Sequence, residues 1–275
     1  MSIPSRQPAL RLQDTPDPES IPVNDPGNAT HQLSRFSTCP KLTHEKAAKQ
    51  LVRHLKSAAE EGIIVKPDRA QGLTCYVDAD FAGNWKLDQA LDPRACLSRT
   101  GFIIFYANCP VIWQSKLQST ISLSTTEAEY VALSTAMRDV TCLVHLIEEI
   151  KEAGIELPTA SQPKTICRVF EDNVGALELA NTHKLRPRTK HLAVQLHHFR
   201  QHVLDKTIVV EKVDTQCQRA DMFAKASPRD AFRHLRKTII GWQCFARECR
   251  ILKMRWNLSK FPHVPSMNVV ISRSS

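Results

Sequence analysis

Four acidic residues stand where an α/β fold could bring their carboxylates together. They are Asp78, Glu129, Asp172 and Asp221. Hydrolysis of a phosphodiester needs an activated water and a stabilised leaving oxygen, and two divalent metal ions about 4 Å apart can supply both. Each ion carries two positive charges, and hard cations such as Mg²⁺ prefer carboxylate oxygens as ligands. The four acids are therefore the candidate catalytic and metal-binding residues.

Each of these acids also has a purely structural interpretation. Asp78 can belong to an acidic turn after a strand. Glu129 can be the third-position partner of Thr126 in a capping box. Asp172 can cap the helix that follows it, and Asp221 can be a first-turn acid that the helix dipole favours. Spacing alone does not choose between these roles and a metal site.

The composition favours a folded chain with a polyanionic partner. The 275 residues are 42% hydrophobic and can form one large or two small domains. The formal net charge is +9 and the pI is near 9.2, which suggests nucleic acid as a partner. The nine cysteines follow no disulfide framework, so reduced thiols are expected. No apolar run approaches the roughly 18 residues of a membrane span, and no membrane partner is expected.

Hydrophobic periodicity predicts the elements that must position the acids. The predicted strands are Ile63–Val65, Leu73–Val77, Phe102–Tyr106, Val111–Trp113, Ile166–Phe170 and Ile208–Val213. The predicted helices are Lys46–Leu55 with Thr43 as its cap, Thr126–Ile150, Val174–Asn181, a segment from Leu192 to Val203, Cys217–Ala226 and residues 228–240. This order indicates an α/β domain with a mixed sheet. Residues 1–27 are expected to be disordered, and residues 243–275 form an irregular basic tail.

Seven short blocks of sequence follow one another between residues 28 and 242. They are Tyr76–Gly83, Ser98–Phe102, Thr126–Leu133, Glu171–Ala176, Arg188–His191, His197–Arg200 and Ala220–Lys225. Together they resemble the ribonuclease H domain of copia-type LTR retrotransposon Pol polyproteins. The resemblance implies a ribonuclease H-like fold, a five-stranded mixed sheet flanked by helices. It also implies that the four acids bind metal and catalyse, with Glu129 preferred to Glu127.

The resemblance implies metal-dependent endonucleolytic hydrolysis of the RNA strand of RNA–DNA hybrids, within a Pol polyprotein. The cofactor would be two Mg²⁺ ions, with Mn²⁺ as the alternative. Residues 28–70 resemble the connection region after a reverse transcriptase, and residues 71–242 the ribonuclease H-like domain. Partners would be the hybrid and the rest of the polyprotein, in the cytoplasm or a virus-like particle. Polymerase activity is not expected, because the roughly 70 upstream residues cannot hold a polymerase palm and fingers.

A basic segment between the third and fourth acids is a candidate for contacts with the nucleic-acid backbone. Its cations are Lys184, Arg186, Arg188 and Lys190, and a solvated charged loop is the alternative. Trp113 could face the hybrid, but a buried Trp is expected. Zinc sites on Cys244 and Cys249, or on His191, His197 and His198, are disfavoured by their spacing. The competing function is a catalytically inactive nucleic-acid-binding remnant of a decayed retroelement.

Overall fold

The structure is a computed structural model of the chain, and it describes residues 26–58, 62–87, 91–157, 164–181, 200–240 and 269–271. The chain divides into two compact units, Met1–Glu60 and Glu61–Ser275. The whole five-stranded sheet belongs to the second unit. The domain limits expected after residues 27, 70 and 242 remain predictions.

The first unit contains two helices, α1 (Pro26–Ser34) and α2 (Leu42–Ser57). Helix α1 begins within the range predicted to be disordered, with a proline in its first position, where no backbone donor is needed. Helix α2 begins four residues before the predicted start, and Lys41 rather than Thr43 is its N-cap residue. The backbone N–H of Lys41 donates to His44 Nδ1 at 3.1 Å, which fixes this end of the helix.

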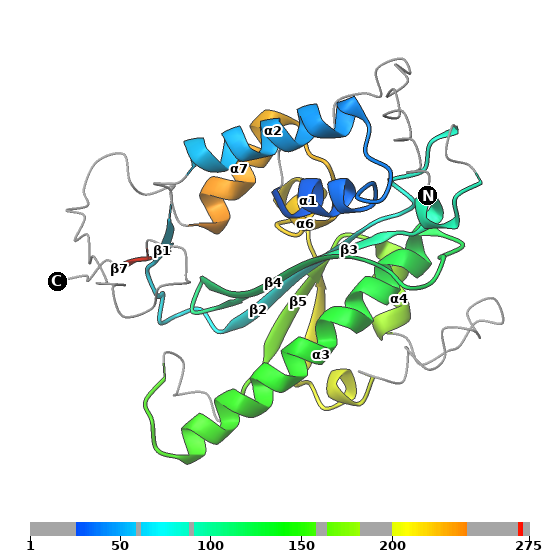
Figure 1. The fold of residues 1–275 in the computed structure, drawn as a ribbon. Helices are drawn as coiled ribbons and strands as arrows, with labels where there is room; N and C mark the ends of the chain where they lie inside the picture. The colour runs from blue at the N-terminus through cyan, green and yellow to red at the C-terminus, as the bar shows by residue number, and fades with distance from the viewer. Residues whose placement is uncertain are drawn as a thin grey trace, which may run out of the picture. The chain divides into compact units, whose positions relative to one another are not determined.

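Five strands form a mixed sheet in the order β4-β3-β2-β5-β6 (Figure 1). The strands are β2 (Leu73–Asp80), β3 (Arg99–Tyr106), β4 (Cys109–Leu117), β5 (Cys167–Glu171) and β6 (Ile208–Lys212). Strands β2, β3 and β4 pair antiparallel, whereas β2, β5 and β6 pair parallel. The predicted five-stranded mixed sheet is confirmed. A separate parallel pair joins β1 (Ile63–Val65) to β7 (Val269–Ile271), so part of the tail predicted to be irregular is a strand.

Helices cover both faces of the sheet. The described helices of the second unit are α3 (Thr125–Glu152), α4 (Val174–Asn181), α6 (Asp221–Ala224) and α7 (Arg229–Ile239), and its short 3-10 helices are η2 (Pro93–Cys96) and η4 (Thr215–Cys217). Side chains of α3 and α4 pack with Val77 and Val169 in the main core on one face. Phe223 of α6 and Ile239 of α7 pack with Phe105 on the other face. The predicted arrangement of helices flanking a sheet is therefore confirmed.

Helix α3 is long and apolar enough, by length and composition, to cross a membrane. Its apolar stripe is nevertheless the one expected of a core helix, and it packs against the sheet. The stripe consists of Tyr130, Leu133, Met137, Val140, Val144 and Ile147, all buried. The helix thus forms the centre of the main core and positions the residues of its first turns.

The predicted helix Cys217–Ala226 is wrong, because the chain is interrupted between η4 and α6. The cause is Gln218, whose side chain is fully buried. Its Nε2 donates to the carbonyl oxygen of Val77 at 2.8 Å, and its Oε1 accepts from the backbone N–H of Ala220 at 3.3 Å. A buried amide gains most when both of its ends are hydrogen-bonded. Gln218 therefore ties the start of α6 to strand β2, immediately before Asp78.

Candidate active site

Parallel pairing of β2 with β5 brings two of the four predicted acids together. Tyr76 lies opposite Phe170 in this ladder, and the same register, continued by two residues, sets Asp78 level with Asp172. Parallel strands run in the same direction, so the carboxyl-terminal ends of β2 and β5 lie together, and both acids lie at this end of the sheet. The alternation along β2 places Val77 in the core beneath α3 and turns Asp78 to the opposite face.

Helix α3 supplies the third acid from its second turn. Ser124 is the N-cap residue, and its hydroxyl accepts from the backbone N–H of Glu127 at 3.1 Å. Glu127 in turn accepts from the backbone N–H of Leu123 at 2.8 Å. The capping interactions of α3 thus use Ser124 and Glu127, so Glu129 has no capping role and its structural interpretation is wrong.

Asp172 is also free of the capping role that sequence allowed. The N-terminus of α4 is capped by Asn173, whose Oδ1 accepts from the backbone N–H of Ala176 at 3.0 Å. Asp172 instead turns a carboxylate oxygen toward Asp78 and Glu129. Ligand oxygens of these three residues all lie within 4.8 Å of one another. The spacing is that of carboxylates able to bind one cation.

Two of the three carboxylates in this cluster, Asp78 and Glu129, are buried and short of hydrogen bonds, whereas Asp172 is partly exposed. Asp78 is 0% exposed and Glu129 is 7% exposed. Within the described part of the chain, Asp78 Oδ2 and Glu129 Oε2 are buried and have no hydrogen-bond partner. Buried carboxylate oxygens are costly without a partner, and a divalent cation would supply one. The cluster therefore fits a hard metal ion.

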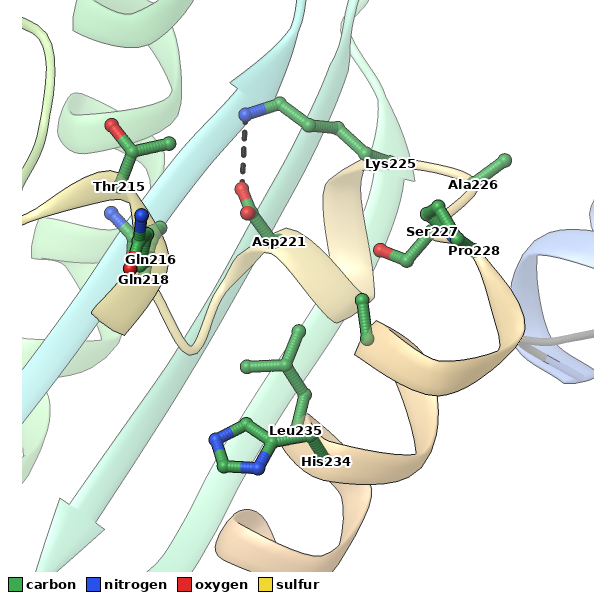
Figure 2. Close-up of a pocket in the computed structure, with 11 residues that line it drawn as sticks. Thr215, Gln216, Gln218, Asp221, Lys225, Ala226, Ser227, Pro228, His234 and Leu235 are labelled. Atoms are coloured by element: carbon green, nitrogen blue, oxygen red, sulfur yellow. Dashed lines mark hydrogen bonds and ion pairs between the residues drawn. The ribbon is translucent and has the colours of Figure 1, made fainter.

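Asp221 stands beside this cluster rather than inside it. It is the first residue of α6, and Lys225, one turn later, connects it to Asp78. The ammonium Nζ of Lys225 lies 2.7 Å from Asp78 Oδ1 and 2.9 Å from Asp221 Oδ1; the second contact is the dashed line in Figure 2. All four predicted acids thus converge, three directly and the fourth through a lysine.

Crowding of the carboxyls changes their proton affinities. Burial, and then the negative charges of Glu171 and Asp78, raises the pKa of Glu129 to about 10. Burial raises the pKa of Asp78 to about 7 although Lys225 opposes the rise. At neutral pH without a metal ion, the Glu129 carboxyl therefore keeps its proton. Cation binding would displace that proton, which couples metal affinity to pH.

Two further charged residues of this region, Glu171 and Lys225, were not among the predicted site residues. Glu171 is fully buried, and burial raises its pKa well above the usual range. Cys167, Val169 and Glu171 alternate toward the core along β5, so the period-two pattern of the strand could have revealed the buried acid. The spacing of four residues between Asp221 and Lys225 was the available signal for the lysine.

A cleft of about 300 Å³ adjoins the site on the side of α6 and α7 (Figure 2). Its lining includes Asp221 and Lys225 together with Thr215, Ser227 and His234. The cleft therefore reaches the two charged residues of α6 and connects them to solvent.

Several predicted residues cannot be placed. The basic residues Lys184, Arg186, Arg188 and Lys190 lie outside the described residues, as do Cys244, Cys249, His191, His197 and His198. Trp113 can be placed, and the expectation that it is buried is wrong. It lies on the edge strand β4, opposite Ile103 of β3, and it is 46% exposed.

Sequence comparison relates the chain to retrotransposon polyproteins. It is 31% identical over 211 residues to the Retrovirus-related Pol polyprotein from transposon RE1 of Arabidopsis thaliana, which is 77% of this chain and 13% of that protein. It is 31% identical over 217 residues to the corresponding polyprotein from transposon TNT 1-94 of Nicotiana tabacum, covering 79% and 15%. The chain thus spans only about an eighth of these relatives. No family model matches the chain.

Solved ribonuclease H structures align with the chain at low similarity. The N-terminal ribonuclease H domain of a Mycobacterium tuberculosis protein has 16% identity and a TM-score of 0.37, covering 61% of this chain and 97% of that one. The compost-derived LC11-RNase H1, in complex with an RNA/DNA hybrid, has 14% identity and a TM-score of 0.37, covering 55% and 92%. With such scores, the assignment depends on the sequence relatives and the observed sheet. The chain is therefore homologous to a segment of retrotransposon Pol polyproteins, and it contains the five-stranded mixed sheet that the resemblance to ribonuclease H domains implied.

Proposed function

We propose that this chain is a metal-dependent endoribonuclease that hydrolyses the RNA strand of RNA–DNA hybrids. The observation that carries the proposal is the cluster of Asp78, Glu129 and Asp172, whose ligand oxygens lie within 4.8 Å of one another. Two buried oxygens of this cluster, Asp78 Oδ2 and Glu129 Oε2, have no hydrogen-bond partner among the described residues. Among the described residues, neither a capping role nor an ion pair accounts for Glu129, which supports a role as a metal ligand.

The donor set favours Mg²⁺ or Mn²⁺, because every donor is a carboxylate oxygen. Asp78, Glu129 and Asp172 would hold the first ion, and Asp221 lies where it would help Asp78 to hold a second. When bound, divalent cations in such a site supply an activated water and stabilise charge on the leaving oxygen. The protein contributes a rigid support, since Asp78 is on a central strand and Glu129 is on the core helix.

Selection of the RNA strand would depend on its 2′-hydroxyls, which an A-form duplex displays in a wide, shallow minor groove. The net charge of +9 supports a nucleic-acid partner. We propose Lys184, Arg186, Arg188 and Lys190 as contacts to the phosphate backbone, and the remainder of a Pol polyprotein as a second partner.

The test is cleavage of a hybrid labelled on either the RNA or the DNA strand, with EDTA, Mg²⁺ or Mn²⁺. The proposal predicts metal-dependent cutting of the labelled RNA strand and an intact DNA strand. Replacing Asp78 by Asn should reduce the rate by more than about 100-fold, because it removes a direct metal ligand. A folded wild-type protein that binds the hybrid without cutting it would instead support the inactive, nucleic-acid-binding remnant.

A further inference from the structure

Lys225 holds its ammonium group where a second metal ion would be expected. Its Nζ donates to Asp78 Oδ1 at 2.7 Å and to Asp221 Oδ1 at 2.9 Å. The backbone N–H of Lys225 also donates to the carbonyl oxygen of Asp221 at 2.9 Å, which anchors the lysine at the end of α6. The ammonium thus bridges and neutralises two carboxylates from different elements, as a divalent ion bound at this position would.

Asp78 belongs to two cation positions at once. Its Oδ1 faces Lys225, whereas its Oδ2 has no partner among the described residues. The first position lies among Asp78, Glu129 and Asp172; within the described residues, the Lys225 ammonium pairs with Asp78 but with neither Glu129 nor Asp172. The second lies between Asp78 and Asp221 and contains the Lys225 ammonium. The two positions share Asp78, but only the second is already occupied by a cationic group of the protein, the Lys225 ammonium.

We propose that Lys225 is an internal cation that occupies the second metal position. This inference depends on the metal site of the proposed function. The protein without nucleic acid would bind one divalent ion tightly, at Asp78, Glu129 and Asp172. A second ion would enter only by displacing the Lys225 ammonium from Asp78 and Asp221.

The Lys225 ammonium can be displaced from the carboxylates because its side chain borders a solvent-accessible cleft. Its side chain is 37% exposed, and it lines the cleft of about 300 Å³ that opens beside α6 (Figure 2). The ammonium could therefore leave the carboxylates and be solvated without unfolding of α6. The cost is the loss of two charge-assisted hydrogen bonds, which are stronger than neutral ones. That cost would be subtracted from the affinity of the second ion.

Counting bound Mn²⁺ by electron paramagnetic resonance tests the inference, with wild type, Lys225→Met and Lys225→Arg compared in the absence of nucleic acid. Wild type and Lys225→Arg should bind one ion tightly, because both keep a cation between Asp78 and Asp221. Lys225→Met should bind a second ion at least about tenfold more tightly than wild type does. Lys49→Met is the matched control, because Lys49 pairs with Glu45 at the same spacing of four residues, although this ion pair is far more exposed than that of Lys225. The Lys49→Met substitution should leave Mn²⁺ binding unchanged.

Acylation of lysines, mapped by mass spectrometry, tests the same inference in the unaltered protein. Lys225 should be protected without metal, remain protected when the first ion binds, and become reactive at the higher Mg²⁺ concentration that fills the second position. Equal Mn²⁺ stoichiometry and affinity in wild type and Lys225→Met, or protection of Lys225 at all Mg²⁺ concentrations, would overturn the inference while leaving hybrid cleavage intact. Absence of Mn²⁺ binding in every variant would overturn both the inference and the proposed metal site.

Discussion

Replacing Glu129 by Gln should stabilise the metal-free protein at alkaline pH. Glu129 is 7% exposed, and its pKa is raised from 4.5 to about 10 by burial and by neighbouring carboxylates. The folded state therefore binds the Glu129 proton more tightly than the unfolded state does. Stability is lost as pH rises from 4.5 towards 10, because the unfolded carboxyl gives up its proton first. Gln has nearly the same shape and no proton to lose, so it removes this penalty.

The magnitude follows from the interval between the pH and the unfolded pKa. At pH 8 the penalty on Glu129 is about 5 kcal/mol, whereas at pH 5 it is about 1 kcal/mol. The free energy of unfolding of Glu129→Gln in EDTA should thus exceed that of wild type by up to about 5 kcal/mol at pH 8, with a small difference at pH 5. Such a gain would mark Glu129 as a residue retained for function at the expense of stability.

Urea denaturation followed by circular dichroism measures this difference at both pH values. Glu127→Gln is the matched control, because Glu127 accepts a capping hydrogen bond from Leu123 that Gln can also accept. It should change the free energy of unfolding by less than about 1 kcal/mol at either pH. Saturating Mg²⁺ should stabilise wild type but not Glu129→Gln, since only wild type keeps the ligand. A Glu129→Gln protein that is no more stable than wild type at pH 8 in EDTA would refute the reasoning.

Two further substitutions test how the site is supported. Gly101→Ala should destabilise the protein by about 1–3 kcal/mol and weaken Mn²⁺ binding, because the new Cβ would lie 2.5 Å from the backbone nitrogen of Ala224 in α6. Gly72→Ala is the control, because its new Cβ would meet no atom within 4 Å. It should change neither stability nor Mn²⁺ binding in the same denaturation and binding assays. Ser124→Ala should lower the free energy of unfolding by about 1 kcal/mol through loss of the α3 cap, and a large loss of Mn²⁺ affinity in this variant would contradict the separation of cap from metal site.

Local patterns in the sequence were sufficient to predict most of the sheet, whereas the choice of Glu129 over Glu127 depended on the resemblance to a known family. The alternation of Leu73, Cys75 and Val77 with polar neighbours identified the central strand, and all three are buried in the core as that pattern requires. The predicted stripe on α3 is buried for the same kind of reason. Such predictions succeed because side-chain periodicity depends on backbone geometry alone.

The interactions that complete the site join residues far apart in sequence, and no local pattern contains them. Lys225 bonds to Asp78 across 147 positions, and Gln218 bonds to Val77 across 141. Whether Asp172 or Asn173 caps α4 also depends on the strand register that pulls Asp172 toward Asp78, since both types are good caps. The predicted burial of Trp113 depended on its aromatic character alone. That character does not show that its strand lies at the edge of the sheet, where Trp113 is 46% exposed.

Cleavage of an RNA–DNA hybrid labelled on the RNA strand is the decisive test of the proposed ribonuclease activity, with wild type, Asp78→Asn and Asp230→Asn assayed side by side in Mg²⁺. Asp230 is an exposed acid in the first turn of α7, away from the carboxylate cluster, so its variant controls for the loss of one negative charge. Wild type and Asp230→Asn should cut the RNA strand, and Asp78→Asn should not. Equal cutting by wild type and Asp78→Asn, or no cutting by a folded wild type, would contradict the proposal.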